Sequence, residues 1–159
     1  MNQLFYGDNL EMLQTQIGDR LRKEFEKWAI LTYTDNQARI NDKATSDQGI
    51  DGVAFISGGT TVFSVKAGNV SLKEIRGFQR VMEREQAVAG ILLTLQPPTK
   101  PMIQEAASFG SIEDGPGLKM SRKIPRLQIV SIRELLDGAR MNPPSAEIVV
   151  NPVKKHKQK

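Results

Sequence analysis

The sequence predicts an α/β fold, an α+β sandwich in which a mixed central sheet of about four strands is flanked by helices. Three observations predict it: a helical stripe near the N-terminus, a β-branched hairpin, and strand-length apolar runs that alternate with capped helices. The chain has 159 residues, 39% hydrophobic and 25% charged, which suits one folded domain. We expect that domain over residues 15–139, between a short lead (1–14) and a Pro-rich, then basic tail (140–159).

A helix is predicted from Ile17 because apolar residues recur at spacings of three and four along one face. These residues are Ile17, Leu21, Phe25, Trp28 and Leu31. The polar segment 32–49 then predicts a loop. Residues 50–56 and 61–66 form a predicted hairpin, since both segments are strand-like and the turn between them contains Gly58-Gly59.

The rest of the chain alternates helix and strand signals. Ser71 and Glu74 have capping-box spacing and open a helix that is predicted to run to Glu85 or Gln86. The apolar run 88–95 predicts a buried central strand. The remaining predicted elements are a short helix (102–108), a Gly- and Lys-bearing loop (110–125), a strand (127–130) and a helix capped by Ser131 that ends at Gly138.

Composition excludes several kinds of chemistry. The absence of cysteine excludes disulfides, zinc–cysteine sites and cysteine nucleophiles, and the one histidine, His156, lies in the tail. The net charge of +4 comes from four lysines among the last six residues, because the other 18 basic residues balance 18 acidic ones. The longest apolar stretch, 87–95, is about half of a membrane span, and the N-terminus does not resemble a secretory signal. We therefore expect a soluble, cytoplasmic protein without a membrane partner.

Three residues stand out for their chemistry: Asp51, Ser64 and Lys66. The predicted hairpin brings Asp51, at the start of one strand, close to Lys66 at the end of the other, and Ser64 shares a face with Lys66. A carboxylate can hold Mg²⁺, which prefers oxygen ligands, while a lysine can position the attacking water and stabilise charge on a phosphate. The pattern indicates metal-assisted cleavage of a phosphodiester.

With Phe25-Glu26 on the preceding helix, the pattern Asp51-x12-Ser64-x-Lys66 resembles the PD-(D/E)xK nuclease superfamily, in its Mrr-like restriction endonuclease branch. The resemblance implies a restriction-endonuclease-like fold. It also implies that Asp51 is the metal-binding carboxylate, that Lys66 is the catalytic lysine and that Glu26 helps to bind the metal. Ser64 stands where the superfamily has Glu, Asp or Gln, and this departure removes a metal ligand.

Residues 49–136 are also similar to the nuclease-like domain that is fused to some bacterial site-specific DNA methyltransferases. The segments that carry this similarity are 64–68, 81–85, 94–102, 105–108 and 132–136. The opening residues 4–11 resemble the start of amino-group DNA methyltransferases. Residues 142–145, Asn-Pro-Pro-Ser, lack the aromatic residue of the catalytic loop of such enzymes, and no Phe-x-Gly-x-Gly loop is present. We therefore expect neither S-adenosylmethionine binding nor methyl transfer.

Two groups of basic residues are candidates for DNA binding, since cations that contact phosphates dominate affinity for DNA. The first group, at helical spacing on one face, is Lys73, Arg76, Arg80 and Arg84. The second group, in the predicted loop, is Lys119, Arg122, Lys123 and Arg126. A salt-bridged helix face is the alternative for the first group, because Glu74, Glu83 and Glu85 lie nearby.

The sequence thus predicts a DNA-binding, restriction-endonuclease-like domain that hydrolyses phosphodiesters with Mg²⁺, with Asp51, Lys66 and Ser64 as the catalytic set. Two alternatives remain open. One is a non-catalytic DNA- or partner-binding accessory module of a restriction–modification system, which Ser64 favours, and the other is a truncated methyltransferase. The expected partners are DNA, a methyltransferase or another subunit of such a system, and a second copy of the chain in a homodimer.

Overall fold

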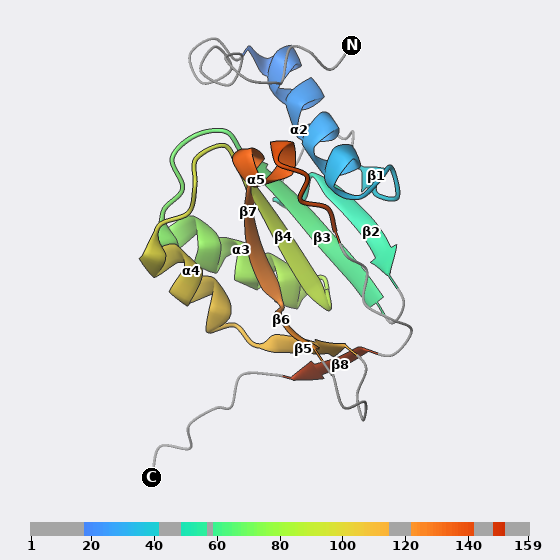
Figure 1. Ribbon diagram of the computed structural model, residues 1–159, viewed down its shortest axis with the longest axis vertical. Coiled ribbons are helices and arrows are strands. Elements are labelled where there is room, and N and C mark those ends of the chain that lie inside the picture. Colours follow the sequence, from blue (N-terminus) through green and yellow to red (C-terminus); the bar gives the residue numbers. More distant parts are fainter. Residues whose placement is uncertain (1–17, 42–48, 57–58, 115–121, 142–147, 152–159) are drawn as a thin grey trace.

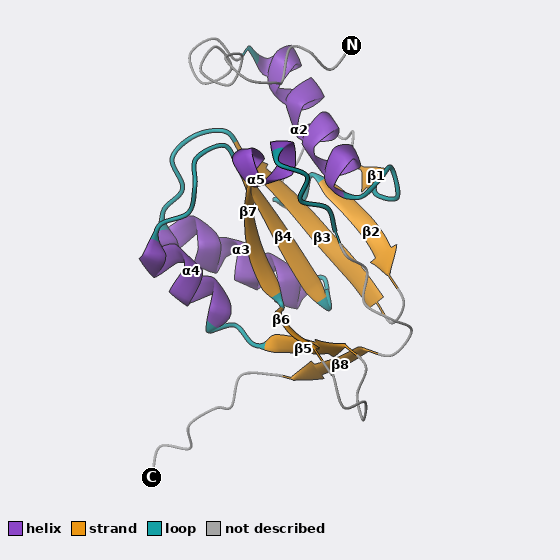
Figure 2. Cartoon of the chain, in the orientation of Figure 1, coloured by secondary structure: helices purple, strands orange, loops and turns teal. Residues whose placement is uncertain are grey.

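A computed structural model describes residues 18–41, 49–56, 59–114, 122–141 and 148–151. A central sheet is covered by helices on both faces, and a smaller sheet lies beyond one of its ends (Figures 1 and 2). The elements are, in chain order, α2 (Asp19–Tyr33), β1 (Arg39–Ile40), β2 (Gly52–Ile56), β3 (Gly59–Lys66), α3 (Leu72–Arg84), β4 (Ala89–Thr94), α4 (Lys100–Ala107), β5 (Ser111–Asp114), β6 (Arg122–Pro125), β7 (Leu127–Ser131), α5 (Ile132–Leu136) and β8 (Ile148–Asn151).

The central sheet has the strand order β1-β2-β3-β4-β7. The first three strands pair antiparallel, whereas β3, β4 and β7 run parallel. All six residues of β4 are buried, as expected for a strand that has parallel neighbours and helices on both faces. The parallel strands end in register, because Lys66 lies opposite Thr94 and Thr94 opposite Ser131. Three strand ends therefore form a single edge of the sheet.

Each face of this sheet has its own hydrophobic core. Alternate residues of a strand point to opposite faces, so Phe63 and Val65 pack against α2 and α5. Val62 and Leu92 point the other way and pack against α3 and α4. Figure 1 shows these helix pairs on the two sides of the sheet. The same alternation places Ser64 and Lys66 of β3 on the side of the sheet that α3 covers.

The fold class predicted from the sequence is confirmed, with three differences in detail. The central sheet has five strands because Arg39–Ile40, in the segment predicted as a loop, pairs with β2. The prediction of a continuous loop over 110–125 was wrong, since β5 and β6 lie there, and the predicted tail contributes β8. Within β5, Ile112 is the one residue described as buried, so the short strand gives almost no periodic signal.

Arg126 lies between β6 of the small sheet and β7 of the central sheet. Its side chain contacts the turn between α3 and β4. Its guanidinium donates to the carbonyls of Ala87 at 2.8 Å and Val88 at 3.2 Å. It also lies over the ring of Phe109, 4.9 Å from the ring centroid. This half-buried arginine therefore has a structural role. From the sequence it was predicted to be one of the loop cations that could reach DNA.

We predict that Arg126→Ala lowers the free energy of unfolding by about 2 kcal/mol, because two carbonyls lose a charged donor. Urea denaturation followed by circular dichroism measures the change. Lys123→Ala, a neighbouring exposed cation in β6, is the control and should change stability by no more than about 0.5 kcal/mol. Equal losses for the two variants would contradict a specific structural role for Arg126.

Candidate functional site

The candidate site lies at the edge where β3, β4 and β7 end. Lys66, Thr94 and Ser131 are the last residues of these strands, and the following helices begin at the same edge. In sheets with parallel strands, ligands bind outside the carboxyl ends of the strands, near the positive ends of the helices. The strand β2 runs in the opposite direction, so its first residues reach this edge as well.

Asp51 immediately precedes β2, and its carboxylate is held by two donors. Oδ2 accepts the backbone N–H of Val65 at 2.8 Å and the hydroxyl of Ser64 at 3.3 Å. Asp51 in turn donates its own backbone N–H to the carbonyl of Phe63 at 2.8 Å. The last residue pair of the β2–β3 ladder is Gly52 with Phe63, so the carboxylate supplies an acceptor just where strand pairing stops. These bonds fix the carboxylate next to the end of β3.

Ser64 and Lys66 lie on the α3 side of β3. Both residues line a cavity between this strand and α3, as expected from the alternation of side chains along the strand. Ser64 is only 2% exposed, and its hydroxyl donates to Asp51. Lys66 is half-buried. The hairpin therefore places Asp51 against Ser64, and Lys66 lies two residues further along the same face of β3. The meeting of Asp51 with Lys66 stays a prediction.

Glu26 reaches the same edge from α2. Burial and then the negative charge of Asp51 raise the pKa of Glu26 to about 7, while the cations Arg22, Lys66 and Lys23 act in the opposite direction. The helix that the sequence predicted from its apolar stripe thus brings Glu26 into the electrostatic field of Asp51 and Lys66. Of the four residues singled out from the sequence, Asp51 and Ser64 are in direct contact, and Glu26 lies near enough to Asp51 and Lys66 to interact with their charges.

Glu74 lines the same cavity as Ser64 and Lys66, although the sequence assigned it to the helix cap and to a salt-bridged helix face and not to the site. Its carboxylate accepts hydrogen bonds from the backbone N–H and the hydroxyl of Ser71, the latter at 2.8 Å. These bonds, with the nearby charges of Lys66 and Lys73, lower the pKa of Glu74. The capping box so soon after Lys66 was the signal that could have located it.

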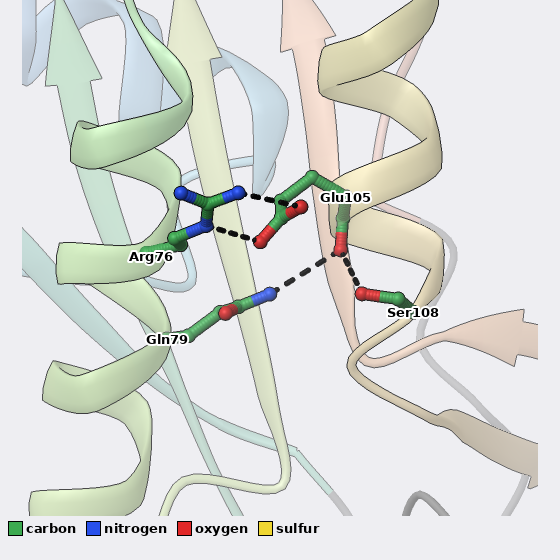
Figure 3. Close-up of polar contacts among 4 residues, drawn as sticks. All are labelled: Arg76, Gln79, Glu105 and Ser108. Carbon is green, nitrogen blue, oxygen red and sulfur yellow. Dashed lines mark hydrogen bonds and ion pairs between the residues drawn. The ribbon is translucent and has the colours of Figure 1, made fainter.

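The predicted cationic group on α3 does not act as one surface. Arg76 forms an ion pair with Glu105 of α4, with Nε 2.7 Å from the carboxylate, and Gln79 donates to the Glu105 carbonyl at 3.3 Å (Figure 3). Arg84 donates to Glu85 at 3.0 Å and also lines the cavity. The salt-bridged interpretation therefore holds for Arg76 and Arg84, whereas phosphate binding by this face stays a prediction.

The other cations that were predicted to bind DNA differ in exposure and in position. Lys73 and Arg80 are exposed on α3, and Lys123 is exposed on β6. Arg122 is the first residue of β6, and Lys119 lies outside the described residues. The predicted lead at 1–14 and the Asn-Pro-Pro-Ser segment at 142–145 also lie outside them. Of the predicted DNA contacts, Lys73, Arg76, Arg80 and Arg84 lie on α3, the helix that lines the cavity.

Asp51 and Glu26 are the two carboxylates at this edge that could hold a magnesium ion. Mg²⁺ in phosphate-processing sites is commonly bound through one or two carboxylates, with waters and phosphate oxygens as the other ligands. Asp51 and Glu26 are two carboxylates whose charges oppose each other, and a cation between them would relieve that repulsion. In the described part of the chain, no three His, Cys, Asp or Glu side chains gather into a metal-ligand cluster.

Comparison with known proteins identifies the family of this domain. A family model described as restriction endonuclease, of the Mrr catalytic type, matches residues 21–118, more than half of the chain. The match spans Glu26, Asp51, Ser64, Lys66 and the whole of α3. Searches of curated proteins and of solved structures gave no match. Among the described helices, none is long and apolar enough to cross a membrane.

We predict that Glu26→Gln stabilises the metal-free protein at high pH. A carboxyl group with a raised pKa favours the folded state below the ordinary pKa near 4.5, and this contribution is lost as pH rises through about 7. At pH 8 the variant should therefore gain about 1–2 kcal/mol in free energy of unfolding, after allowance for solvent screening.

Urea denaturation in EDTA between pH 5 and pH 8 measures this gain, which should shrink towards pH 5. Glu24→Gln, an exposed glutamate on the same helix, is the matched control, and its difference from the parent should stay within about 0.5 kcal/mol. A gain for Glu26→Gln that does not vary with pH would contradict the electrostatic explanation.

Proposed function

The chain belongs to the restriction endonuclease family, and we propose that it binds DNA at the sheet edge of Asp51 and Lys66 and hydrolyses a phosphodiester there with Mg²⁺. One observation carries the proposal. The Asp51 carboxylate is fixed by Val65 and Ser64 at the strand end that carries Lys66, within a chain of the nuclease family. A carboxylate and a lysine in this arrangement suit attack by water on a phosphate.

In this proposal each residue has a distinct role. Asp51 and Glu26 would hold the metal, which when bound polarises the phosphate and makes water more acidic. Lys66 donates to the attacking water or to a phosphate oxygen, and it stabilises negative charge as that charge develops. Ser64 keeps the Asp51 carboxylate oriented through its hydroxyl. The raised pKa of Glu26 implies that metal binding competes with a proton near neutral pH.

Exposed cations beside the site support DNA as the substrate. Lys73 and Arg80 lie on α3, the helix that lines the cavity next to Lys66. Contacts between such cations and phosphates position a duplex without reading its sequence. Arg76 is already paired with Glu105, so it should contribute less than its neighbours.

A second candidate function is a non-catalytic DNA-binding module, serving as an accessory subunit of a restriction–modification system. The observation that favours it is Ser64, a neutral residue in the position where the superfamily has an acidic residue or glutamine. With one carboxylate fewer, metal affinity falls, while the cations that contact phosphates are unaffected.

We predict that the protein nicks supercoiled plasmid DNA in Mg²⁺ or Mn²⁺, and that Asp51→Asn and Lys66→Met each reduce the rate at least a hundredfold. The reduction follows from loss of a metal ligand in the first variant and of charge stabilisation in the second. Agarose gel electrophoresis of the nicked product measures the rate. Lys100→Met, at the start of α4 and exposed, is the control and should retain the parent rate.

Binding in EDTA separates the two candidate functions. If the parent binds DNA but no metal supports nicking, and Asp51→Asn binds equally well, the accessory function stands and the nuclease function is wrong. If the parent neither binds nor nicks DNA, both candidates are wrong.

We predict that Lys73→Gln and Arg80→Gln each weaken DNA binding and each lower the slope of log affinity against log salt by about one. Arg76→Gln should lower this slope by less than half as much, because the Arg76 guanidinium already faces Glu105. Fluorescence anisotropy with a labelled duplex at several salt concentrations measures the slopes. Equal slopes for all three variants would contradict the distinction between paired and exposed cations.

A further inference from the structure

The cavity between β3 and α3 has a volume of about 330 Å³ and opens beside the candidate site. It is lined by Gly49, Ser64, Lys66, Glu74, Gly77, Phe78, Val81 and Arg84. Its volume is at the lower end of the range for small-molecule pockets, so it suits a single small group and not an extended chain. Its lining combines cations, an apolar wall and polar groups.

Gly77, in the middle of α3, leaves one wall of this cavity open. Glycine is among the poorest helix formers, and its use inside a helix calls for a local reason. Positive φ is not that reason, because Gly77 is not among the described glycines with positive φ. Crowding is not the reason either, since a Cβ built at Gly77 would have no neighbouring heavy atom within 4 Å. What the missing side chain provides is room in the cavity.

The chemistry of the lining selects the kind of ligand. Lys66 and Arg84 suit a phosphate, whereas Val81 and the small exposed part of Phe78, a core residue that is 5% exposed, give the cavity an apolar wall. A purely apolar ligand would leave these cations desolvated, and a bare anion would gain nothing from the apolar wall. A nucleotide has both parts, a charged phosphate and a flat base, and the Glu74 carboxylate adds a hydrogen-bond acceptor for the base.

We propose that this cavity binds one unstacked nucleotide, supplied by the DNA that is bound at the adjacent edge. The inference rests on the proposed DNA-binding function, and it adds that the protein prefers DNA in which a nucleotide is unpaired. Removing a base from a duplex costs stacking and pairing energy, and this cost is smallest where the base has no partner. The phosphate of that nucleotide lies with Lys66 and Arg84, and its base lies against the apolar wall that Val81 and the exposed part of Phe78 form.

The test compares two labelled duplexes of the same sequence in EDTA, one fully paired and one with a single extra, unpaired nucleotide. Fluorescence anisotropy with the full chain should show about tenfold tighter binding of the duplex with the unpaired nucleotide. Gly77→Leu fills the cavity and should abolish the preference. Gly77→Ala, which adds only a methyl group and improves helix propensity, should retain most of it.

Two controls make the result specific. Thermal unfolding of both Gly77 variants shows whether they fold, and Gly77→Ala should unfold at a higher temperature than the parent. Ala107→Leu, an equivalent enlargement at an exposed position of α4, should leave the preference unchanged. Free deoxynucleoside monophosphates, measured by calorimetry, identify the source of the nucleotide. If they bind the parent and Gly77→Ala but not Gly77→Leu, while the two duplexes bind equally, the cavity takes free nucleotides.

The outcomes separate the inference from the proposed function. If both duplexes bind equally well and free nucleotides do not bind, or if Gly77→Leu keeps the preference, the cavity inference is wrong while DNA binding stands. If neither duplex binds the parent protein, the proposed function itself is wrong.

Discussion

The parallel pairing of β3, β4 and β7 is the constraint on which the site depends. Because these strands end in register, Lys66, Thr94 and Ser131 lie along one edge, and the helices that follow start from it. The antiparallel strand β2 then needs only to begin nearby for Asp51 to reach the hydroxyl of Ser64 and the backbone of Val65. The directions of the strands therefore determine where the candidate site residues lie. The helices on both faces provide the hydrophobic cores that keep the strands aligned.

The three carboxylates near this edge are stabilised to different degrees. Asp51 receives two hydrogen bonds, and Glu74 receives two from its own helix cap, so both carboxylates have donors in the folded protein. Glu26 has a raised pKa because it is buried next to Asp51. The folded protein thus carries an energetic cost at Glu26 that a bound cation would remove. Such a cost is typical of sites that are organised for a ligand more than for stability.

How much was predictable from the sequence depends on the range of the contacts involved. The hairpin fixes the contact of Asp51 with the Ser64 segment of β3, because two strands in one hairpin have a nearly determined register. Glu26 followed from the family resemblance. The pairing of Arg76 with Glu105 spans 29 residues and depends on how α3 packs against α4, which no local pattern specifies. The cavity at Gly77 depends on the same packing, and β5 and β6 are too short and polar for a periodic signal.

The position of β8 has a practical consequence for how this chain can be engineered. In the small sheet β6-β5-β8, β8 covers one side of β5 through antiparallel pairing of Ser111 with Asn151 and Asp114 with Ile148. Cutting the chain before residue 148 would leave the backbone donors and acceptors on that side of β5 exposed to solvent. Such an edge can recruit a strand from another molecule, so shortened forms would tend to self-associate. Expression tags and fusion partners therefore belong beyond residue 151.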